Sequence, residues 1–311
     1  MKNAPSFAEI NSLFSNTDPK VVWTKAVGII KLINPAYDFT VAQTSFDDVV
    51  RMFRGNYPGY CPIKTLYHNL HHTMDVFLCA VRLMHGVHLS GTKLSDNELT
   101  MIMMAALMHD IGYAQRVGED TGTGAQYTLT HVGRGIKFMQ RYTIEQGFPP
   151  DLAGPLKFII RCTDPAENIP DIDFPDERTH MLGQIVCSAD LAGQMADRTY
   201  LEKLLFLYLE FEEAHFGNYQ NIHDMLSKTQ DFYKKIIHKL DVDLGGLYTK
   251  LAFHFKDRYG IEKNYYQESI EKNIAYLTTI TKQNEETHLT MLKRGGIVEK
   301  SEPMLTQSKP D

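Results

Sequence analysis

Apolar residues recur three and four positions apart along most of this chain, which is the pattern of amphipathic helices. The alternation of apolar and polar residues that is typical of strands is almost absent. We therefore expect an all-α fold that consists of a single multi-helix domain. The pattern predicts helices at residues 6–34, with a new start at Asp18-Pro19, and at residues 46–53, 67–85, 95–108, 131–142, 151–162, 179–194, 200–215, 222–240, 243–257 and 265–284.

Short stretches rich in glycine, proline and polar residues separate these helices and predict loops. Residues 101–108 are apolar on nearly all sides, so their helix should lie at the centre of the fold. No linker or repeat divides the chain, and we expect one domain over residues 1–285, with 1–60 as a helical preface. Residues 286–311 become polar and predict a loosely held tail. The loops are expected at residues 54–62, 86–94, 114–127 and 165–176.

Composition argues against several classes of protein. The chain has 311 residues, of which 43% are hydrophobic, enough for a sizeable core. The net charge of −6 argues against a protein that coats nucleic acid or anionic membrane. No apolar run approaches the roughly 18 residues that cross a bilayer, and the first residues lack the pattern of a signal peptide. The four cysteines show no CxxC spacing, which indicates free thiols. We expect a cytoplasmic protein. The helices after residue 215 could form the surface of a homodimer.

The segment from Tyr67 to Val76 concentrates side chains that bind metals or transfer protons. On a helix, His68, His72 and Asp75 would share one face. Two imidazoles and a carboxylate suit zinc, iron or manganese, and one histidine beside the metal could instead donate a proton. The alternative is that these side chains cap the helix, bond to the backbone or face solvent. Three histidines and an aspartate within eight residues favour the metal site.

Three more candidate ligands follow apolar runs. His109-Asp110 ends the apolar helix, and Asp190 comes directly after residues 185–189. Burying ionisable groups there is costly without compensation. A metal compensates most simply, because an aspartate can bridge two ions while a histidine binds one. The alternatives are that His109 interacts with the helix dipole and that Asp190 forms an ion pair with Arg198.

These residues carry a resemblance to a known family. Tyr67 to Val76 matches in full the Tyr-His-Asn-x-x-His-x-x-Asp-Val signature of the class I cyclic nucleotide phosphodiesterases. The order of a histidine, a His-Asp pair and a distant aspartate resembles the wider HD superfamily of metal-dependent phosphohydrolases. Further similarity extends over about residues 60–215. Cys187 to Leu191 resembles the family's Cys-x-Asp-Leu segment, the helix from His131 resembles its paired-histidine helix, and Thr163-Asp164 resembles its Thr-Asp turn.

The resemblance implies a domain of the HD/phosphodiesterase type with two divalent metal ions, which could be zinc, iron, manganese or magnesium. It implies that a hydroxide between the ions is the nucleophile and that His68 is the general acid for the leaving oxygen. The implied ligands of the tighter ion are His72, His109, Asp110 and Asp190; Asp110 also bridges to the second ion, and His131 lies near that ion or its waters. The residues implied to contact substrate or orient ligands are Tyr67, Asn69, Asp75, Tyr113 and Asp164.

Two differences from this family bear on the second metal and on the substrate. Tyr113 stands where the family has a histidine near the second metal, and the C-terminal Gln-x-Gly-Phe segment that holds the nucleotide base is not found. We expect a phosphohydrolase that acts on a small-molecule nucleotide, as a phosphodiesterase for a 3′,5′-cyclic nucleotide or a related phosphodiester. The alternatives are an HD-type phosphomonoesterase or nucleotidase and, third, a non-catalytic sensor module.

Overall fold

The computed structural model describes residues 18–119 and 121–307, which form a single all-α fold and confirm the predicted fold class. These residues contain no strand, only an isolated bridge between Tyr60 and Arg116. The helix expected within residues 6–17 lies outside the described residues. The α-helices are α2 (Pro19–Ile33), α3 (Thr40–Phe53), α4 (Leu70–Leu89), α5 (Asp96–Met108), α6 (His131–Glu145), α7 (Pro150–Arg161), α8 (Glu177–Ala196), α9 (Tyr200–Glu213), α10 (Ile222–His238), α11 (Leu251–Tyr259), α12 (Tyr265–Ile280), α13 (Glu285–Met291) and α14 (Ile297–Gln307).

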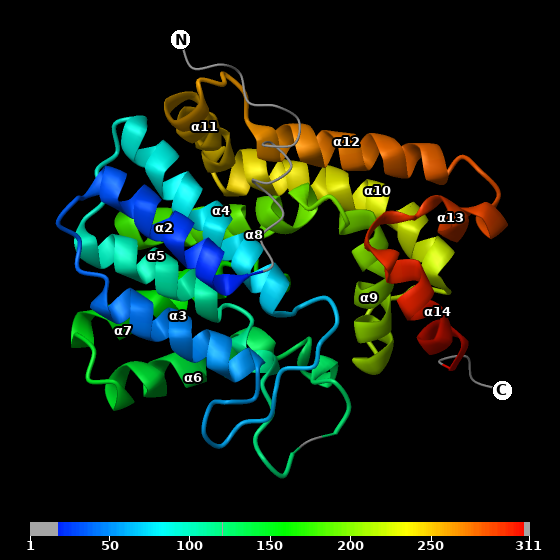
Figure 1. The fold of residues 1–311 in the computed structure, drawn as a ribbon, viewed down its shortest axis with the longest axis horizontal. Coiled ribbons are helices and arrows are strands. Elements are labelled where there is room, and N and C mark those ends of the chain that lie inside the picture. The colour runs from blue at the N-terminus through cyan, green and yellow to red at the C-terminus, as the bar shows by residue number, and fades with distance from the viewer. Residues whose placement is uncertain (1–17, 120, 308–311) are drawn as a thin grey trace.

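Helices α4, α5 and α8 form the centre of the fold (Figure 1). Every residue of α5 from Leu99 to Met108 is buried, as its continuous apolar sequence predicts. α4 packs against α2, α5, α8 and α11, while α8 also contacts α7 and α12. Gly193 lets α8 approach α4 closely, because a Cβ there would lie 3.3 Å from the Asp75 carbonyl oxygen. This packing draws together the segments that carry the candidate metal ligands.

The start of α4 differs from the prediction. The expected helix begins at residue 67, whereas α4 begins at Leu70. Asn69 is its N-cap, and the Asn69 Oδ1 accepts hydrogen bonds from the backbone N–H groups of His71 and His72 at 2.9 and 3.2 Å. The residues before Asn69 therefore form a bend. The expectation that His68 shares a helical face with His72 is wrong, because His68 precedes the helix.

Two other helix boundaries also differ from the predicted ones. α3 begins at Thr40, six residues before the predicted start at 46. The predicted helix at 243–257 is interrupted, because a π-helical turn (η4, Lys239–Asp243) and a 3-10 turn (η5, Leu247–Lys250) precede α11. Gly245 and Gly246 separate these turns with φ angles of 60° and 64°, a left-handed conformation that glycine adopts without strain.

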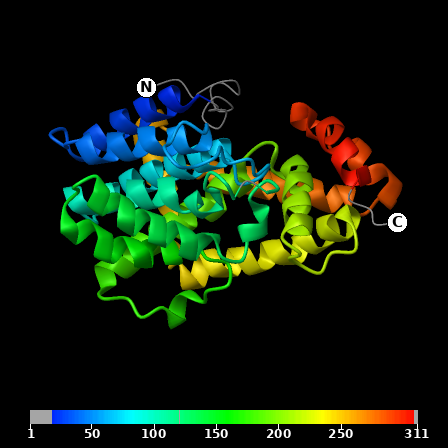
Figure 2. The same ribbon diagram turned by 90° about the horizontal axis from the view of Figure 1, so that it is seen from below.

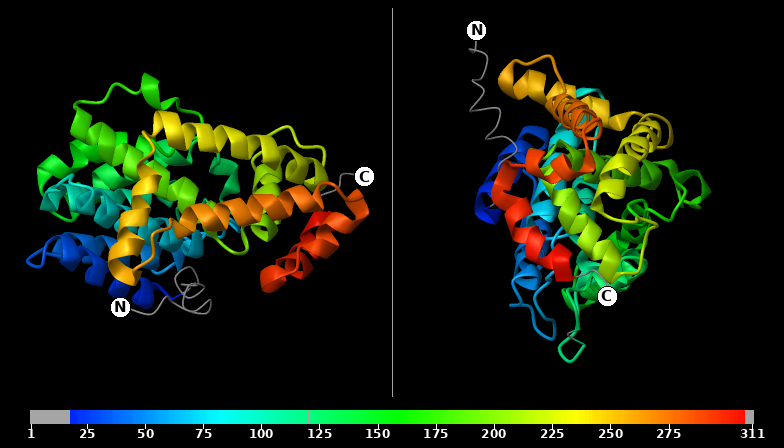
Figure 3. Two further views of the ribbon diagram at one scale, coloured as in Figure 1. Left: turned by 90° about the horizontal axis from the view of Figure 1, so that it is seen from above. Right: turned by 90° about the vertical axis from the view of Figure 1, so that its right-hand side faces the viewer.

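Residues 285–307 form two helices in place of the expected loose tail. α14 packs against α9, with Val298 and Ser301 buried. The chain between α13 and α14 is also held to α9, because the Glu202 carboxylate accepts a hydrogen bond from the backbone N–H of Arg294. Figures 2 and 3 show this last part of the chain extending to one side of the bundle formed by α2–α8. This segment is polar in composition because many of its residues lie on exposed faces. Its buried positions are too few to be evident from composition.

The helices and the cysteines bear on two expectations from composition. Among residues 18–119 and 121–307, no helix has the length and apolar character that crossing a bilayer requires. The four cysteines are free thiols, as their spacing predicts, and three of them are buried.

Candidate metal centre

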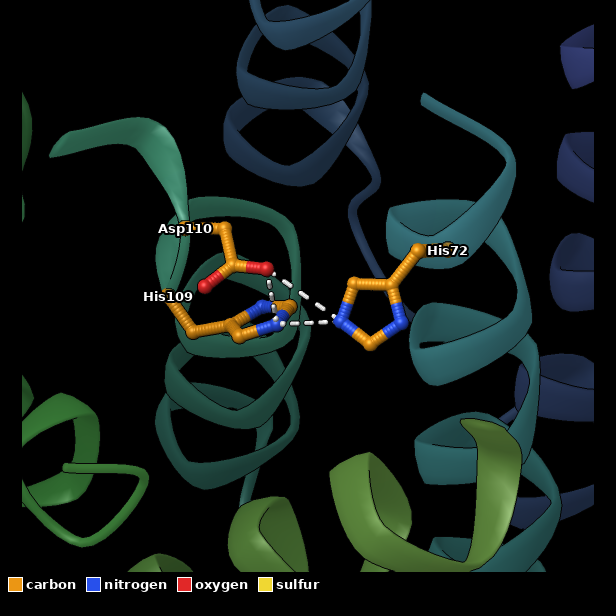
Figure 4. Close-up of side chains that lie close together, drawn as sticks. All are labelled: His72, His109 and Asp110. Atoms are coloured by element: carbon orange, nitrogen blue, oxygen red, sulfur yellow. Dashed lines mark hydrogen bonds and ion pairs between the residues drawn. The ribbon is translucent and has the colours of Figure 1, made fainter. Parts of the chain in front are cut away.

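His72, His109 and Asp110 converge inside the fold, as Figure 4 shows. His72 lies in the first turn of α4, His109 is the C-cap of α5, and Asp110 follows it. The two Nε2 atoms are 3.2 Å apart, and the Asp110 Oδ2 lies 3.2 Å from the Nε2 of His72 and 3.1 Å from that of His109. All three residues are buried. We call them the central cluster, and their donor atoms are close enough together to bind one metal ion.

Asp190 and His131 lie next to the central cluster. Asp190 lies in α8. Its Oδ1 is 3.5 Å from the Nε2 of His72 and 3.8 Å from the Nε2 of His109. His131 is the first residue of α6, and its Nε2 lies 3.5 Å from the other carboxylate oxygen of Asp110, Oδ1. The five expected ligands therefore meet in one place, although they come from four separate parts of the chain.

Backbone carbonyls orient two of the imidazole rings. The Nδ1 of His109 lies 3.0 Å from the carbonyl oxygen of Ala106, and the Nδ1 of His131 lies 2.6 Å from that of Thr128. A carbonyl oxygen only accepts, so we assign the proton to Nδ1 in both rings. The Nε2 lone pairs then face Asp110. Histidine ligands of metals are commonly held in this way, with the outer ring nitrogen donating to the protein.

Gly112 allows the chain after Asp110 to pack against α6. It belongs to a short 3-10 helix, η1 (Ile111–Tyr113). A Cβ at this position would lie 1.8 Å from the carbonyl oxygen of His131 and 2.8 Å from the backbone nitrogen of Gly135. Any side chain would push η1 away from α6. The glycine therefore permits the short approach that sets His131 beside Asp110.

The electrostatics of the site favour an ionised Asp110 beside neutral His72 and His131. Burial lowers the pKa of His72 and also that of His131. Burial alone would raise the pKa of Asp110, but the nearby His109 and His68 hold it well below its usual range. The same pairing outweighs the effect of burial on His109 and raises its pKa to about 9. The carboxylate thus attracts a cation, which is a proton on His109 or a metal ion in its place.

The Asp110 Oδ2 atom tests whether these residues suit a metal. It is buried between the Nε2 atoms of His72 and His109, 3.2 and 3.1 Å away, yet no hydrogen bond of good geometry to it is found in the described part of the chain. Buried polar atoms without a partner are rare in folded proteins, so this one requires an explanation. The imidazole nitrogens and carboxylate oxygens around it are the donors that zinc, iron and manganese prefer. The residues present therefore fit a divalent ion, which would complete the bonding of Oδ2.

Glu210 is a site residue that the sequence analysis missed. Residues 205–213 suggest a packed helix with a solvated face, yet Glu210 is 2% exposed. Its Oε1 accepts hydrogen bonds from the backbone N–H groups of Tyr67 and His68, at 2.6 and 3.3 Å, and its Oε2 lies 2.5 Å from the Nδ1 of His68. Burial would lower the pKa of His68, but Glu210 raises it to about 8. No local pattern distinguishes Glu210 from the other glutamates of α9.

Tyr113 lies between two of the histidines. Its ring stacks on that of His68, with centroids 4.9 Å apart, and on that of His131, with centroids 4.5 Å apart. The interplanar angles are 20° and 15°. The tyrosine therefore occupies the space between His68 and His131, where the family resemblance places a histidine.

The contacts of Asp190 favour the cluster over the alternative ion pair. Besides the two histidines, the Asp190 Oδ1 accepts a hydrogen bond from the Gln194 side-chain amide at 3.3 Å. The Oε1 of Gln194 in turn accepts a hydrogen bond from the Tyr67 hydroxyl at 2.8 Å. The ion pairs found for Asp190 are to His72 and His109, not to Arg198. Hydrogen bonds thus link Tyr67 to Asp190 through the side chain of Gln194.

Asp75 and Asp164 lie apart from the central cluster. The Asp75 Oδ2 is 3.6 Å from the Nε2 of His71. His71, Asp75 and Asp197 form a second group with donor atoms spaced closely enough for a metal, which we call the flanking cluster. Asp164 lies in the turn after α7, where its carboxylate accepts a hydrogen bond from the backbone N–H two residues later. Neither of these contacts links the two aspartates to the central cluster, and their roles in contacting substrate or orienting ligands stay predictions.

Comparison with known proteins identifies a family for this chain. The chain matches the model of the Npun_R2479-like family in two overlapping segments, residues 58–144 and 119–252. No curated protein matches the chain. The matched segments together cover more than half of the 311 residues and include the central cluster, Asp190, His131, His68 and Glu210. The chain therefore belongs to the Npun_R2479-like family.

Proposed function

We propose that this protein is a metal-dependent phosphohydrolase, and that it acts as a phosphodiesterase on a 3′,5′-cyclic nucleotide or a related small phosphodiester. One observation carries the proposal: the buried Asp110 Oδ2, without a hydrogen bond, lies within 3.2 Å of two imidazole Nε2 atoms. The sequence resemblance of Tyr67 to Val76 to the class I cyclic nucleotide phosphodiesterases supports the choice of substrate class.

The protein's own residues supply binding, orientation and proton transfer in this proposal. His72, His109, Asp110 and Asp190 would hold one divalent ion, and Asp110 with His131 would approach a second. Bound divalent ions acidify water and offset charge on phosphoryl oxygens. Since the donors around Asp110 are buried, they act in a low dielectric, where charge stabilisation is strong.

His68 is the proposed general acid. Its Nδ1 is engaged by the Glu210 Oε2 at 2.5 Å, which leaves Nε2 as the nitrogen that can donate a proton to the leaving oxygen. Glu210 also accepts hydrogen bonds from the backbone at residues 67 and 68, so it orients both the ring and the bend that carries it. Glu210 is thus a positioning residue, because it acts through His68.

A second candidate is a phosphomonoesterase or nucleotidase of the HD group. The observation that favours it is Tyr113, whose ring fills the space between His68 and His131. A phenol is neutral at physiological pH, and burial raises the pKa of Tyr113 further above its usual range. The second ion would then have fewer ligands than a two-metal diesterase centre requires. The resemblance to the diesterases is thus weakest at the second ion, which leaves a monoesterase of the wider HD group as the second candidate.

The test is a substrate panel with metal-replete protein. Cyclic AMP, cyclic GMP, a non-cyclic diester and nucleoside monophosphates would be assayed side by side with added manganese. Hydrolysis of diesters, lost in Asp110→Ala, would support the proposal. Hydrolysis of monoesters alone would overturn the diesterase assignment in favour of the second candidate. If the replete protein hydrolysed none of these esters, the site would be that of a sensor module.

A further inference from the structure

A basic pocket lies beside η1, the 3-10 helix that follows the central cluster. Its volume is about 240 Å³. Arg116, Arg134, Lys137 and Arg141 line it, together with one acidic residue, Glu119. Four cations minus one anion give this lining a formal charge of +3, in a chain whose net charge is −6. A concave surface with such a charge raises the local concentration of anions.

Most of this positive charge is not neutralised by the protein. Arg116 and Lys137 are exposed, and no side-chain hydrogen bond or ion pair is found for either within the described residues. Arg141 donates a hydrogen bond to the Tyr60 hydroxyl at 2.5 Å, and its Nε lies 3.4 Å from the Glu145 carboxylate. Both side chains of that ion pair are more than 40% exposed, so solvent screens it strongly. The pocket therefore presents unsatisfied donors to a ligand.

Arg134 is fixed in place within the pocket. Its Nε and Nη2 donate hydrogen bonds, both of 2.8 Å, to the carbonyl oxygens of Gly112 and Ala114. Its guanidinium also lies over the ring of Tyr127, 3.6 Å from the ring centroid. No hydrogen bond from the Arg134 Nη1 is found among the described residues. An arginine held in this way loses little conformational entropy when an anion binds to its remaining donors.

We propose that this pocket binds the phosphate group of a small phosphorylated molecule. Phosphate oxygens accept hydrogen bonds from several guanidinium and ammonium groups at once, and the pocket supplies four such groups. Its volume, below the roughly 300 Å³ at the lower end of ordinary ligand sites, suits a phosphate group with a small part of the molecule that carries it. The rest of the ligand would extend along the aromatic rings of Tyr60 and Phe138, which also line the pocket.

This pocket is distinct from the proposed hydrolytic site. No residue of the central cluster lines it, and neither do His68 and Glu210. Ile111 and Gly112 contribute to its wall, and Arg134 bonds to the carbonyl of Gly112, two residues after Asp110. A bound phosphate would therefore contact the chain that carries the central cluster without occupying the cluster. The proposal does not depend on whether the central cluster hydrolyses phosphate esters.

Calorimetric titration of the full chain in the presence of a chelator tests the proposal, because metal removal suppresses binding of phosphate to metal ions. The probes are inorganic phosphate, AMP and adenosine. We expect phosphate and AMP to bind, and adenosine not to bind. In Arg116→Ala/Lys137→Ala, AMP affinity should fall about 100-fold, since each charge-assisted contact contributes about tenfold. The matched control is Lys235→Ala/Lys282→Ala, which removes two exposed cations outside the pocket and should bind AMP like the wild type.

The design gives clear outcomes because Arg116 and Lys137 are exposed and their loss should leave the fold intact. Thermal unfolding monitored by circular dichroism would verify this. Stronger binding of AMP than of inorganic phosphate would place part of the nucleoside against the aromatic rings. Equal binding by adenosine, unchanged AMP affinity in the double variant, or no binding by the wild type would each overturn the proposal. Because the protein is metal-free here, a failed hydrolytic assignment would not alter the result.

Discussion

The central and flanking clusters contain the same residue types, yet they differ in what neutralises them. Each combines imidazole and carboxylate donors at metal-binding spacing, and the neighbours His71 and His72 belong to different clusters. In the flanking cluster, the Lys203 Nζ lies 2.8 Å from the His71 Nδ1 and forms an ion pair with Asp197. In the central cluster, the ion pairs found for Asp110 are all to histidines.

This difference teaches that donor spacing alone does not identify a metal site. In the flanking cluster, Asp197 already has a cation supplied by the protein, and Lys203 holds the pKa of Asp197 below its usual range despite burial. Within residues 18–119 and 121–307, no ion pair of Asp110 with a lysine or arginine is found, and its Oδ2 has no hydrogen bond of good geometry. We infer that the central cluster takes a metal and the flanking cluster does not. Four experiments can break or sharpen this inference.

The largest effect is expected from removing a central ligand. His109→Ala or Asp110→Ala should abolish stoichiometric binding of divalent metal, because the remaining donors are too few to replace the hydration of the ion. Elemental analysis of purified, metal-loaded protein measures this directly. His71→Ala is the matched control from the flanking cluster and should retain its metal. If the control lost the metal and His109→Ala kept it, the roles of the two clusters would be reversed.

The next largest effect is expected from removing the proposed proton donor beside the central cluster, which should lower turnover and leave metal binding intact. His68→Ala should keep its metal and lose turnover by about 10²–10⁴-fold, the usual contribution of a general acid. Glu210→Gln should cost less, since the amide can still accept a hydrogen bond but no longer stabilises a charged imidazole. Because Glu210 raises the pKa of His68, the alkaline limb of the pH profile of kcat/KM should lie at lower pH in Glu210→Gln than in the wild type. A purely structural role would not cause this shift. Full activity in His68→Ala would remove His68 from the mechanism.

Sequence reasoning could predict the central cluster because its members stand out locally. His109-Asp110 follows an apolar run, where an ionisable residue is conspicuous, as does Asp190 next to the cluster, and His72 lies in a dense group of histidines. The all-α fold follows likewise from periodicity that is strong in most segments. These features depend on the immediate neighbours of each residue, so one sequence is sufficient to detect them.

The features that could not be predicted depend on contacts between distant segments. Glu210 looks like any glutamate of an amphipathic helix until α9 meets the bend before α4. The bend itself arises because Asn69 caps α4, so that helical periodicity across residue 68 was misleading. Lys203 shows the same limit: nothing near it in the sequence indicates that it neutralises the flanking cluster from α9.

A smaller effect is expected from removing the cation of the flanking cluster. Lys203→Ala leaves Asp197 buried without its partner, and breaking a buried pair costs about 3–5 kcal/mol of the free energy of unfolding. The vacated cluster should then bind a divalent ion that restores part of this stability. Chemical denaturation with and without manganese measures both.

The control for this change is an exposed pair. Lys234→Ala removes a lysine whose ion pair with Asp231 is more than three-quarters exposed, so its stability should change by less than about 1 kcal/mol. Equal destabilisation by the two substitutions would mean that Lys203 does not neutralise a buried charge. Failure of Lys203→Ala to gain a metal would show that the flanking donors are too poorly arranged to bind one.

The smallest effect, as measured at low pH, is expected from replacing an aspartate with its amide in the flanking cluster. Burial, followed by the charge of Asp197, raises the pKa of Asp75 well above its usual range. The folded state then retains a proton that the unfolded state releases, so this group stabilises at low pH and its contribution falls as the pH rises above about 3.9. Asp75→Asn should remove that decline and change stability at low pH by less than about 1 kcal/mol. Denaturation curves at a series of pH values measure this.

Asp110→Asn provides the contrast, because the same change in the central cluster should eliminate metal binding. Equal metal loss in both variants would contradict the division between the clusters.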